Sequence, residues 1–387
     1  MKRVVIVGAS LAGVRTASAL RREGFSGEIT VIGDEPHLPY DRPPMSKQVL
    51  QGKWGIEKTG LLSTEQMAEL GAEWILGDAA QQLDVSSRTI RTKSGREVEG
   101  TYVVIATGAR ARRLPFSADN EIFTMRTLDD AQQLAATCDS LPQRATVAVI
   151  GGGFIGAEVA TALHARELRP IVLEAQARPL QGVVGEEVAT WLEGLPGAAG
   201  VELRVNQNVL DVVRTPSGFQ VILADGPMEA DAVVAGVGAV PNCEWLESSG
   251  VAIQRGLVVD EYLLAAPGIY GAGDVAVFPF TSAGETEHVR IEHWQIANDH
   301  ASYIARSILT DESQPFTTVP YFWSDQYGKK IQMLGHPRPS DEVTIVSGSP
   351  EDGKWLAHYR RHGVVTGVVA LNNARELMLS RPLLETV

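Results

Sequence analysis

The first 35 residues carry the pattern that most restricts the fold of this 387-residue chain. Val4 to Val7 form an apolar run that is long enough for a buried strand and too short for a helix, and a glycine-containing turn follows at once. A helix is predicted next, and the run from Glu28 to Gly33 predicts a second strand. A strand, a glycine turn, a helix and a strand that ends at an acid are the arrangement that holds a dinucleotide.

Each position of this turn has a predicted role. Gly8 permits the tight turn, and free amides at the helix start face the pyrophosphate with help from the helix dipole. Glu35 can accept hydrogen bonds from both ribose hydroxyls. Ser10 stands where the second glycine of G-x-G-x-x-G is usual, and we interpret this small residue as tolerated. Ala12 and Gly13 complete the motif, which alone also fits a βαβ unit in any doubly wound fold.

A second unit of the same kind begins at Thr146. Gly151, Gly153 and Gly156 form a complete G-x-G-x-x-G, and Glu174 follows after about 20 residues. One FAD unit followed by one nicotinamide unit implies hydride transfer between two nucleotides. A Glu174 carboxylate about 4 Å from a 2′-phosphate would cost up to roughly 4 kcal/mol at an effective dielectric constant of 20. The sequence therefore predicts NADH rather than NADPH as the substrate.

Charge and composition restrict the remaining possibilities. The formal net charge of −13 argues against nucleic acid and anionic membrane surfaces as main partners. No apolar run reaches the roughly 18 residues that span a bilayer, and the first strand leaves no room for a secretory signal. Cys138 and Cys243 give no disulfide framework and no zinc spacing, and His288 and His293 are poorly placed for one metal ion. We expect a cytoplasmic protein of two or three domains without a metal site.

Several strings of the chain carry a resemblance to one family. PYDRPPMSK, which ends at Lys47 behind the first motif, resembles the FAD-dependent ferredoxin reductases of Rieske oxygenase and cytochrome P450 systems, of the putidaredoxin reductase and biphenyl dioxygenase reductase type. Three further strings resemble the same family, namely IYGAGDVAVF at 269–278, YFWSDQ at 321–326 and LNNAR at 371–375. YVVIATGAR at 102–110 resembles the A-T-G motif of flavoproteins with two dinucleotide sites. The resemblance implies a tightly bound FAD and NADH as substrate.

The resemblance also implies catalytic roles. Lys47 would lie beside the reactive end of the isoalloxazine, Arg42 would line the flavin, and Glu158 would approach Lys47 in an ion pair beside the nicotinamide. The alternatives are a proline-stiffened surface loop with solvated charges, and a glutamate that only interacts with the dipole of its helix.

Further cofactor contacts are implied in the same way. Asp274 would bond the ribitol, although it could also cap a helix, and the backbone of Trp294 would contact the flavin pyrimidine. Neighbouring residues of a strand face opposite sides, so Trp323 is predicted to cover the flavin or the docking site, with a core tryptophan as the alternative. The other residues assigned to the cofactors are Ala80, Thr107, Gly108, Arg126 and Gly238.

The predicted fold is α/β, with two Rossmann-like domains of the glutathione-reductase type and a C-terminal α+β interface domain. We expect an FAD-binding domain at 1–110 and 243–313, an NADH-binding domain at 111–242, and the interface domain at 314–387.

The predicted reaction follows from the family resemblance and from the absence of a cysteine pair after the first glycine motif. Flavin disulfide reductases need a C-x4-C pair after the first motif, where this chain has Pro43 to Ser46, so a thiol relay is excluded. We expect an NADH:ferredoxin reductase that serves a small acidic [2Fe-2S] ferredoxin as a monomer or weak homodimer. A rubredoxin reductase, an NADH oxidase and a non-catalytic NADH-sensing flavoprotein remain alternatives. The acidic partner would require a basic rim, for which the candidates are Arg110, Arg112, Arg113, Lys329 and Lys330.

Overall fold

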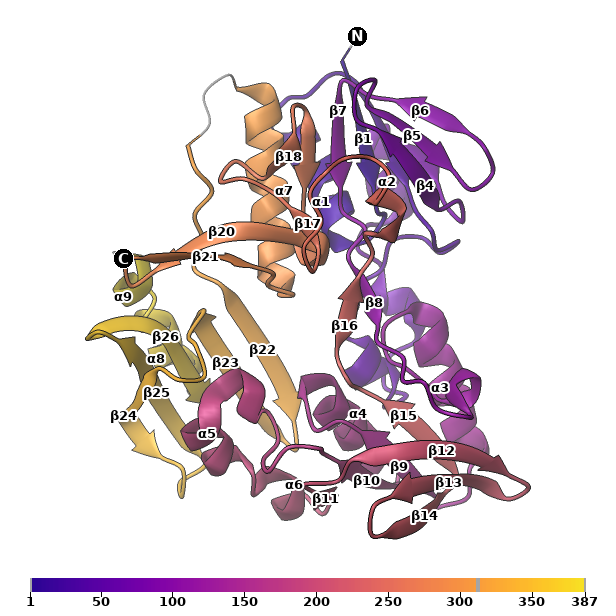
Figure 1. Ribbon diagram of the computed structural model, residues 1–387, viewed down its shortest axis with the longest axis vertical. Coiled ribbons are helices and arrows are strands. Elements are labelled where there is room, and N and C mark those ends of the chain that lie inside the picture. Colours follow the sequence, from indigo (N-terminus) through magenta and orange to yellow (C-terminus); the bar gives the residue numbers. More distant parts are fainter. Residues whose placement is uncertain (1, 311–313, 386–387) are drawn as a thin grey trace.

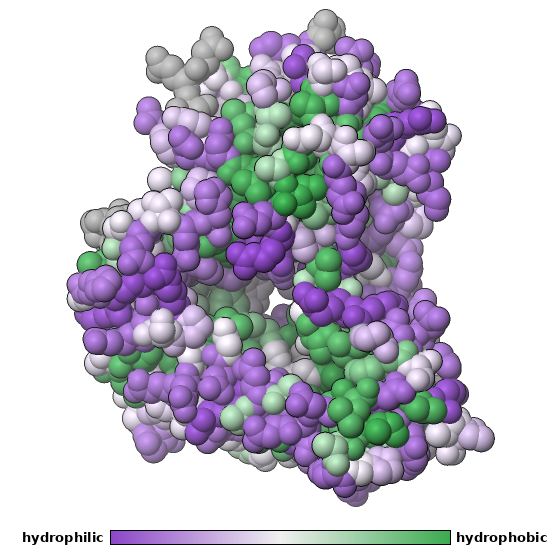
Figure 2. All heavy atoms as spheres, in the orientation of Figure 1, coloured by the Kyte–Doolittle hydropathy of each residue, from purple (hydrophilic) through white to green (hydrophobic). Residues whose placement is uncertain are grey.

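The computed structural model describes residues 2–310 and 314–385, which form three domains around a central opening (Figures 1 and 2). The first domain contains a six-stranded sheet, parallel except for one edge strand, in the order β18-β19-β7-β1-β2-β3. Strand β1, which lies between β7 and β2, is buried from Val4 onward, as expected for an apolar strand with neighbours on both sides. The strands are β1 (Arg3–Val7), β2 (Glu28–Ile32), β3 (Glu73–Ile75), β7 (Tyr102–Ile105), β18 (Leu264–Ala266) and β19 (Ile269–Gly271).

Helix α1 (Leu11–Arg22) of the first domain packs against α7 (Trp294–Leu309), and α2 (Thr64–Leu70) lies nearby. A small antiparallel sheet of β4 (Ala80–Asp84), β5 (Thr89–Thr92) and β6 (Glu97–Glu99) extends the domain. β17 (Leu257–Val258) pairs with β20 (Ala276–Ser282), which forms a hairpin with β21 (Glu285–Val289). This β20–β21 hairpin reaches toward the C-terminal domain (Figure 1).

The second domain repeats the architecture with a four-stranded parallel sheet in the order β11-β10-β9-β15. These strands are β9 (Thr146–Ile150), β10 (Arg169–Leu173), β11 (Glu202–Arg204) and β15 (Ala232–Ala235). An antiparallel sheet adds β12 (Val209–Thr215), β13 (Gly218–Leu223) and β14 (Gly226–Ala230). The helices are α3 (Leu128–Ser140), α4 (Phe154–His164), α5 (Gln181–Leu192) and α6 (Leu195–Ala198).

Two antiparallel strands connect the first domain with the second. The chain leaves through β8 (Ala109–Ala111) and returns through β16 (Ala239–Pro241), and Ala111 lies opposite Ala239. Beside them, the Thr107 hydroxyl donates to the Asn242 carbonyl at 2.7 Å, and the Asn242 amide donates to the Thr107 carbonyl at 3.0 Å. The second domain is therefore inserted into the first through one paired connection.

The third domain is a five-stranded antiparallel sheet in the order β22-β23-β26-β25-β24. Five strands are predicted here from the sequence, about Tyr321, Ile331, Val343, Leu356 and Val364, and all five are confirmed. Their bounds are β22 (Tyr321–Gln326), β23 (Lys329–Gly335), β24 (Glu342–Ser349), β25 (Lys354–Arg361) and β26 (Val364–Leu371), followed by α8 (Ala374–Leu379) and α9 (Pro382–Glu385).

The proline-rich loop after β2 ties the first domain to the second. Its short helix η1 (Met45–Val49) is a π-helix, a geometry that often marks functional sites. Met45, Val49 and Leu50 are buried in the apolar core of the second domain, together with residues of α3 and α4. The loop therefore belongs to the first domain by sequence and to the second by packing, which fixes Lys47 between them.

Candidate active site

The first glycine-rich turn has the shape of a nucleotide cradle. A Cβ atom on Gly13 would lie 1.8 Å from the carbonyl oxygen of Gly8, so only glycine allows α1 to pack this closely on β1. Ser10 occupies the N-cap position of α1, but its side chain makes no capping hydrogen bond. The first-turn amides and the Ser10 hydroxyl therefore remain available for a phosphate group. Ala12 lies next to Gly273, close to the predicted G-D motif.

Glu35 is held by the loop that follows it. Its two carboxylate oxygens accept hydrogen bonds from the Tyr40 hydroxyl at 2.5 Å and from the Arg42 guanidinium at 2.7 Å. The Tyr40 hydroxyl also accepts from the amide of Leu128, and burial raises the pKa of Tyr40. Glu35 is therefore fixed in place, while each of its oxygens keeps acceptor capacity for a ribose hydroxyl.

Arg126 joins two of the predicted flavin strings. Its guanidinium contacts Asp274 at 2.7 Å and donates to the carbonyl of Ala109 at 2.8 Å, and it passes close to Gly108. The backbone carbonyl of Arg126 in turn accepts from Arg42. Asp274 is not a helix cap, because its carboxylate pairs with Arg126 at the start of a short 3-10 helix.

Lys47 and Glu158 form the predicted ion pair, which is confirmed at 2.8 Å between Nζ and Oε2. Only 11% of the Lys47 side chain and 4% of the Glu158 side chain are exposed. The lysine comes from η1 and the glutamate from α4, so the pair bridges the two nucleotide motifs. Removing one partner of such a buried pair leaves an uncompensated charge.

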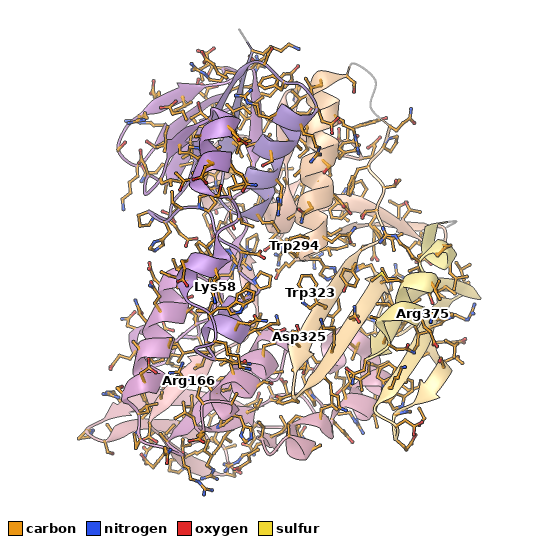
Figure 3. The ribbon with its side chains drawn as sticks, turned by 180° about the vertical axis from the view of Figure 1, so that it is seen from behind. Lys58, Arg166, Trp294, Trp323, Asp325 and Arg375 are labelled. Carbon is orange, nitrogen blue, oxygen red and sulfur yellow. The ribbon has the colours of Figure 1, made fainter. Side chains whose placement is uncertain are left out.

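Aromatic side chains border the central opening. Figure 3 labels Trp294 at the start of α7 and Trp323 on β22, which face the opening from two domains, and their rings lie 6.2 Å apart. Tyr321 stacks on Trp323, whereas Phe322 turns to the other face of β22 and packs on Phe154. The alternation predicted from the sequence is thus confirmed, and Trp323 is not a core residue.

The polar groups beside Trp294 suit a ligand with both donors and acceptors. The Trp294 indole donates to Asp41 at 2.9 Å, and burial raises the pKa of that carboxyl group. Nδ1 of His293 and Oε1 of Gln295 are buried and have no hydrogen-bond partner among the residues that the structure describes. Buried polar atoms are normally satisfied, so these two atoms fit the polar edge of a flavin ring.

The second glycine-rich turn repeats the first. A Cβ atom on Gly156 would lie 2.0 Å from the Gly151 carbonyl, whereas around Gly153 the nearest atom is at 4.0 Å, which leaves space for a ligand. The Glu174 carboxylate accepts from the amide of Gly152 at 2.7 Å and from that of Gln176 at 2.8 Å. The acid predicted to select NADH is therefore held at the mouth of the turn.

The remaining predicted residues lie at the edges of these clefts. Gly238 has a left-handed backbone (φ +96°), and apart from its chain neighbours no described residue has an atom within 4 Å of a Cβ atom added to it. Ala80 begins β4. The predicted contacts of these two residues with the cofactors stay predictions.

The candidates for a basic rim are partly neutralised. Arg110 pairs with Glu244, Arg113 with Asp119, and Lys330 with Asp325.

In the part of the chain that the structure describes, no three His, Cys, Asp or Glu side chains gather in a way that could hold a metal ion. Nor is any helix within those residues long and apolar enough for a membrane crossing.

Sequence reasoning missed several residues of the site. Tyr40, Ser46 and Asp41 stand inside the PYDRPPMSK string, and Ser324 stands inside YFWSDQ, but each has a hydrogen-bond partner far away in sequence. The only available signal was their position next to residues that were assigned roles.

Comparison with known proteins agrees with this geometry. Residues 2–301 match the pyridine nucleotide-disulphide oxidoreductase family model, and residues 321–387 match the reductase C-terminal model. The rhodocoxin reductase of Rhodococcus erythropolis is 33% identical, with 99% of this chain and 89% of the relative covered. The ferredoxin–NAD(+) reductase subunit of the benzene 1,2-dioxygenase system of Pseudomonas putida is 34% identical, with coverage of 99% and 92%.

A solved structure shows the same fold. The reductase in the covalent putidaredoxin reductase–putidaredoxin complex is 30% identical and superposes with a TM-score of 0.92, with 99% of this chain and 93% of that chain covered. The predicted fold class, with two nucleotide-binding domains and a C-terminal reductase domain, is therefore confirmed. The chain belongs to the pyridine nucleotide-disulphide oxidoreductase family and, within it, to the FAD- and NAD-dependent ferredoxin reductases.

Proposed function

We propose that this protein is an NADH:ferredoxin reductase that delivers electrons singly to a small acidic [2Fe-2S] ferredoxin of an oxygenase or P450 system. The observation that carries the proposal is the Lys47–Glu158 pair, which joins the two nucleotide motifs, in a chain that has Pro43 to Ser46 where a thiol relay would need its cysteines. When bound, FAD supplies chemistry that side chains lack, because its ring accepts a hydride and releases electrons one at a time.

The chain itself binds and orients the two nucleotides. The residues proposed to hold FAD are Gly8, Ser10, Ala12, Gly13, Glu35, Arg42, Lys47, Ala80, Thr107, Gly108, Arg126, Asp274, Trp294 and Trp323. The residues proposed to hold NADH are Gly151, Gly153, Gly156, Glu174 and Gly238.

Lys47 and Glu158 are the proposed catalytic residues. Lys47 provides a positive charge beside the flavin ring, and the buried Glu158 keeps its ammonium group at one position. Trp294 and Trp323 would exclude water from the opening and form the face where electrons leave.

Further parts of the proposal concern the whole protein. We propose domain boundaries at residues 1–110 and 243–313, 111–242, and 314–387, and we expect a monomer or weak homodimer in the cytoplasm. The acidic ferredoxin is supported by the arginine and lysine candidates for the rim, although three of these pair with acids of the chain.

The decisive experiment mixes the purified yellow protein with NADH and a panel of acceptors. Fast reduction of [2Fe-2S] ferredoxins supports the proposal. Reaction only with rubredoxin or oxygen would support the alternative reductase or oxidase activity. A long-lived charge-transfer complex that reduces no acceptor would support an NADH-sensing role instead.

A further inference from the structure

The carboxylate of Glu158 lies where all three domains meet. Glu158 belongs to α4 of the second domain, and it is 4% exposed. Its Oε2 atom accepts from the Ser46 hydroxyl at 2.6 Å and from Lys47 at 2.8 Å, and both of these residues come from the first domain. Its Oε1 atom accepts from the Ser324 hydroxyl at 2.6 Å and from the Asp325 amide at 3.3 Å, both from the third domain.

The direction of the Ser324 hydrogen bond is fixed by its partner, because an ionised carboxylate can only accept, so the Ser324 hydroxyl donates its proton to Glu158. Gln326, on the same strand, donates its side-chain N–H to Oγ of Ser324 at 3.2 Å. Ser324, Gln326 and Glu158 thus form a buried and ordered chain of hydrogen bonds.

Neither serine can contact a bound nucleotide directly. Ser46 is 3% exposed and Ser324 is 1% exposed, even without any ligand in the clefts. Any effect of these hydroxyls on the reaction must therefore pass through Glu158 and its partner Lys47. Among the described residues, the other hydrogen bond of the Lys47 ammonium group is a weak one, at 3.5 Å, to the carbonyl of Pro43.

We propose that Ser46 and Ser324 are positioning residues, which hold one carboxylate oxygen each so that Glu158 fixes the ammonium group of Lys47. This inference rests on the proposed function. Hydrogen bonds to charged groups in a buried site are worth more than neutral ones. Without a serine, the carboxylate can rotate, and the flexible four-carbon side chain of Lys47 follows it.

The test compares Ser324→Ala and Ser46→Ala with a matched control, Thr161→Val. Thr161 lies one helical turn beyond Glu158 on α4, and its hydroxyl accepts from the amide of Tyr327 at 2.8 Å. The control therefore removes another hydrogen bond between α4 and the third domain without touching Glu158. With NADH and a dye acceptor, each serine variant should lose roughly tenfold in kcat with KM changed less than about twofold, and the control should keep its kcat.

A double variant separates positioning from general destabilisation. If Ser324 acts through Glu158, Ser324→Ala should cause no further loss of kcat in a Glu158→Gln background. Additive losses would overturn the proposal, because they would mean that Ser324 acts independently of Glu158. If Ser324→Ala does not fold with FAD, Ser46→Ala provides the same comparison at the other oxygen.

A second readout does not depend on turnover. The rate at which an amine-reactive ester labels Lys47 in the FAD-loaded protein, followed by peptide mass spectrometry, should rise at least about threefold in both serine variants and stay unchanged in Thr161→Val. Equal labelling and equal kcat in all three variants would overturn the proposal. If the wild-type protein reduces no acceptor with NADH, the proposed function fails, whereas the labelling rates still decide whether the serines position Lys47.

Discussion

At the scale of single residues, the site depends on where a few charges are fixed. Lys47 and Glu158 are separated by more than a hundred positions in sequence, yet they meet in an almost solvent-free space. A charge in such a place acts strongly on its neighbours, because little water screens it. Small changes at these residues should therefore alter the rate of the reaction as well as the stability of the fold.

Replacing Glu158 by Gln should slow the reduction of the bound flavin by NADH at least about tenfold, because the ammonium group of Lys47 loses its charged partner. Stopped-flow absorbance of the flavin measures this rate. Glu167→Gln, at an exposed turn beyond α4, is the matched control and should leave the rate unchanged. An unchanged rate in Glu158→Gln would remove this residue from the mechanism.

Replacing Glu174 by Gln should shift the preference for the nicotinamide substrate. Without the negative charge, kcat/KM for NADPH should rise by roughly ten- to a hundredfold, which is less than the unscreened charge repulsion allows. Steady-state assays with both nucleotides measure the ratio. Glu202→Gln on the neighbouring strand β11 removes a charge that already pairs with Arg169 and Arg204. A similar shift in this control would mean that net charge, and not Glu174, selects the nucleotide.

Residues inside recognisable strings could be predicted from the sequence, and their partners could not. The resemblance of the PYDRPPMSK string and of the second glycine motif to the ferredoxin reductases implied the pairing of Lys47 with Glu158. The hydrogen bonds of Ser46, Tyr40 and Ser324 were not predictable, because a hydroxyl group gives no sequence signal for a partner more than eighty residues away. Such contacts are decided by how whole domains pack.

At the scale of secondary-structure elements, the amphipathic helix α7 contains one fully buried imidazole and begins directly after a second, partly buried one. His293 precedes the helix and His300 lies inside it, where Nδ1 accepts from the amide of Gly273 at 3.1 Å. Burial lowers the pKa of His293 to about 4, with a further contribution from His336 and an opposing one from Asp274. Burial lowers the pKa of His300 to about 3.

These two histidines predict a loss of stability in mild acid. Above pH 6.5 both are neutral in the folded and unfolded states, whereas below it the unfolded chain binds protons that the folded chain does not. The free energy of unfolding should therefore fall between pH 6.5 and pH 4, by up to about 1.4 kcal/mol per pH unit for each histidine. Urea titrations at several pH values measure this slope.

The variant His300→Gln provides the comparison for this pH dependence. Glutamine keeps an acceptor for the Gly273 amide but does not titrate, so the slope should become shallower while the stability at pH 8 changes less. A slope equal to that of the wild type would show that other groups cause the acid sensitivity.

Strands that carry a run or an alternation of apolar residues could be predicted from the sequence. Elements that are held in place by contacts between domains could not. The strands of both glycine-rich units and the five strands of the C-terminal domain follow from apolar runs such as Val147 to Ile150. The extension of the β20–β21 hairpin was not foreseen, because ion pairs of Glu285 and Glu287 with Arg338 hold it against the third domain. Such pairs have no local sequence pattern.

At the scale of the whole molecule, the negative charge of the chain opposes the docking of the acidic ferredoxin that we propose as its partner. The chain carries a net charge of −13, so an acidic ferredoxin must approach a local positive region. Electron transfer to the ferredoxin should therefore slow as ionic strength rises. The measurement is the rate of ferredoxin reduction between low and physiological salt. Reduction of the flavin by NADH serves as the internal reference, and equal salt dependence of both steps would remove the basic rim.

The paired connection formed by β8 and β16 gives the molecule a modular construction. Both covalent links to the nicotinamide half run side by side through this narrow neck, so that half can be exchanged by joining the chain at only two adjacent points. A graft from a relative with a different nucleotide preference would also have to keep the side chains that pack on Met45, Val49 and Leu50, and the register between Ala111 and Ala239 marks where the seams belong.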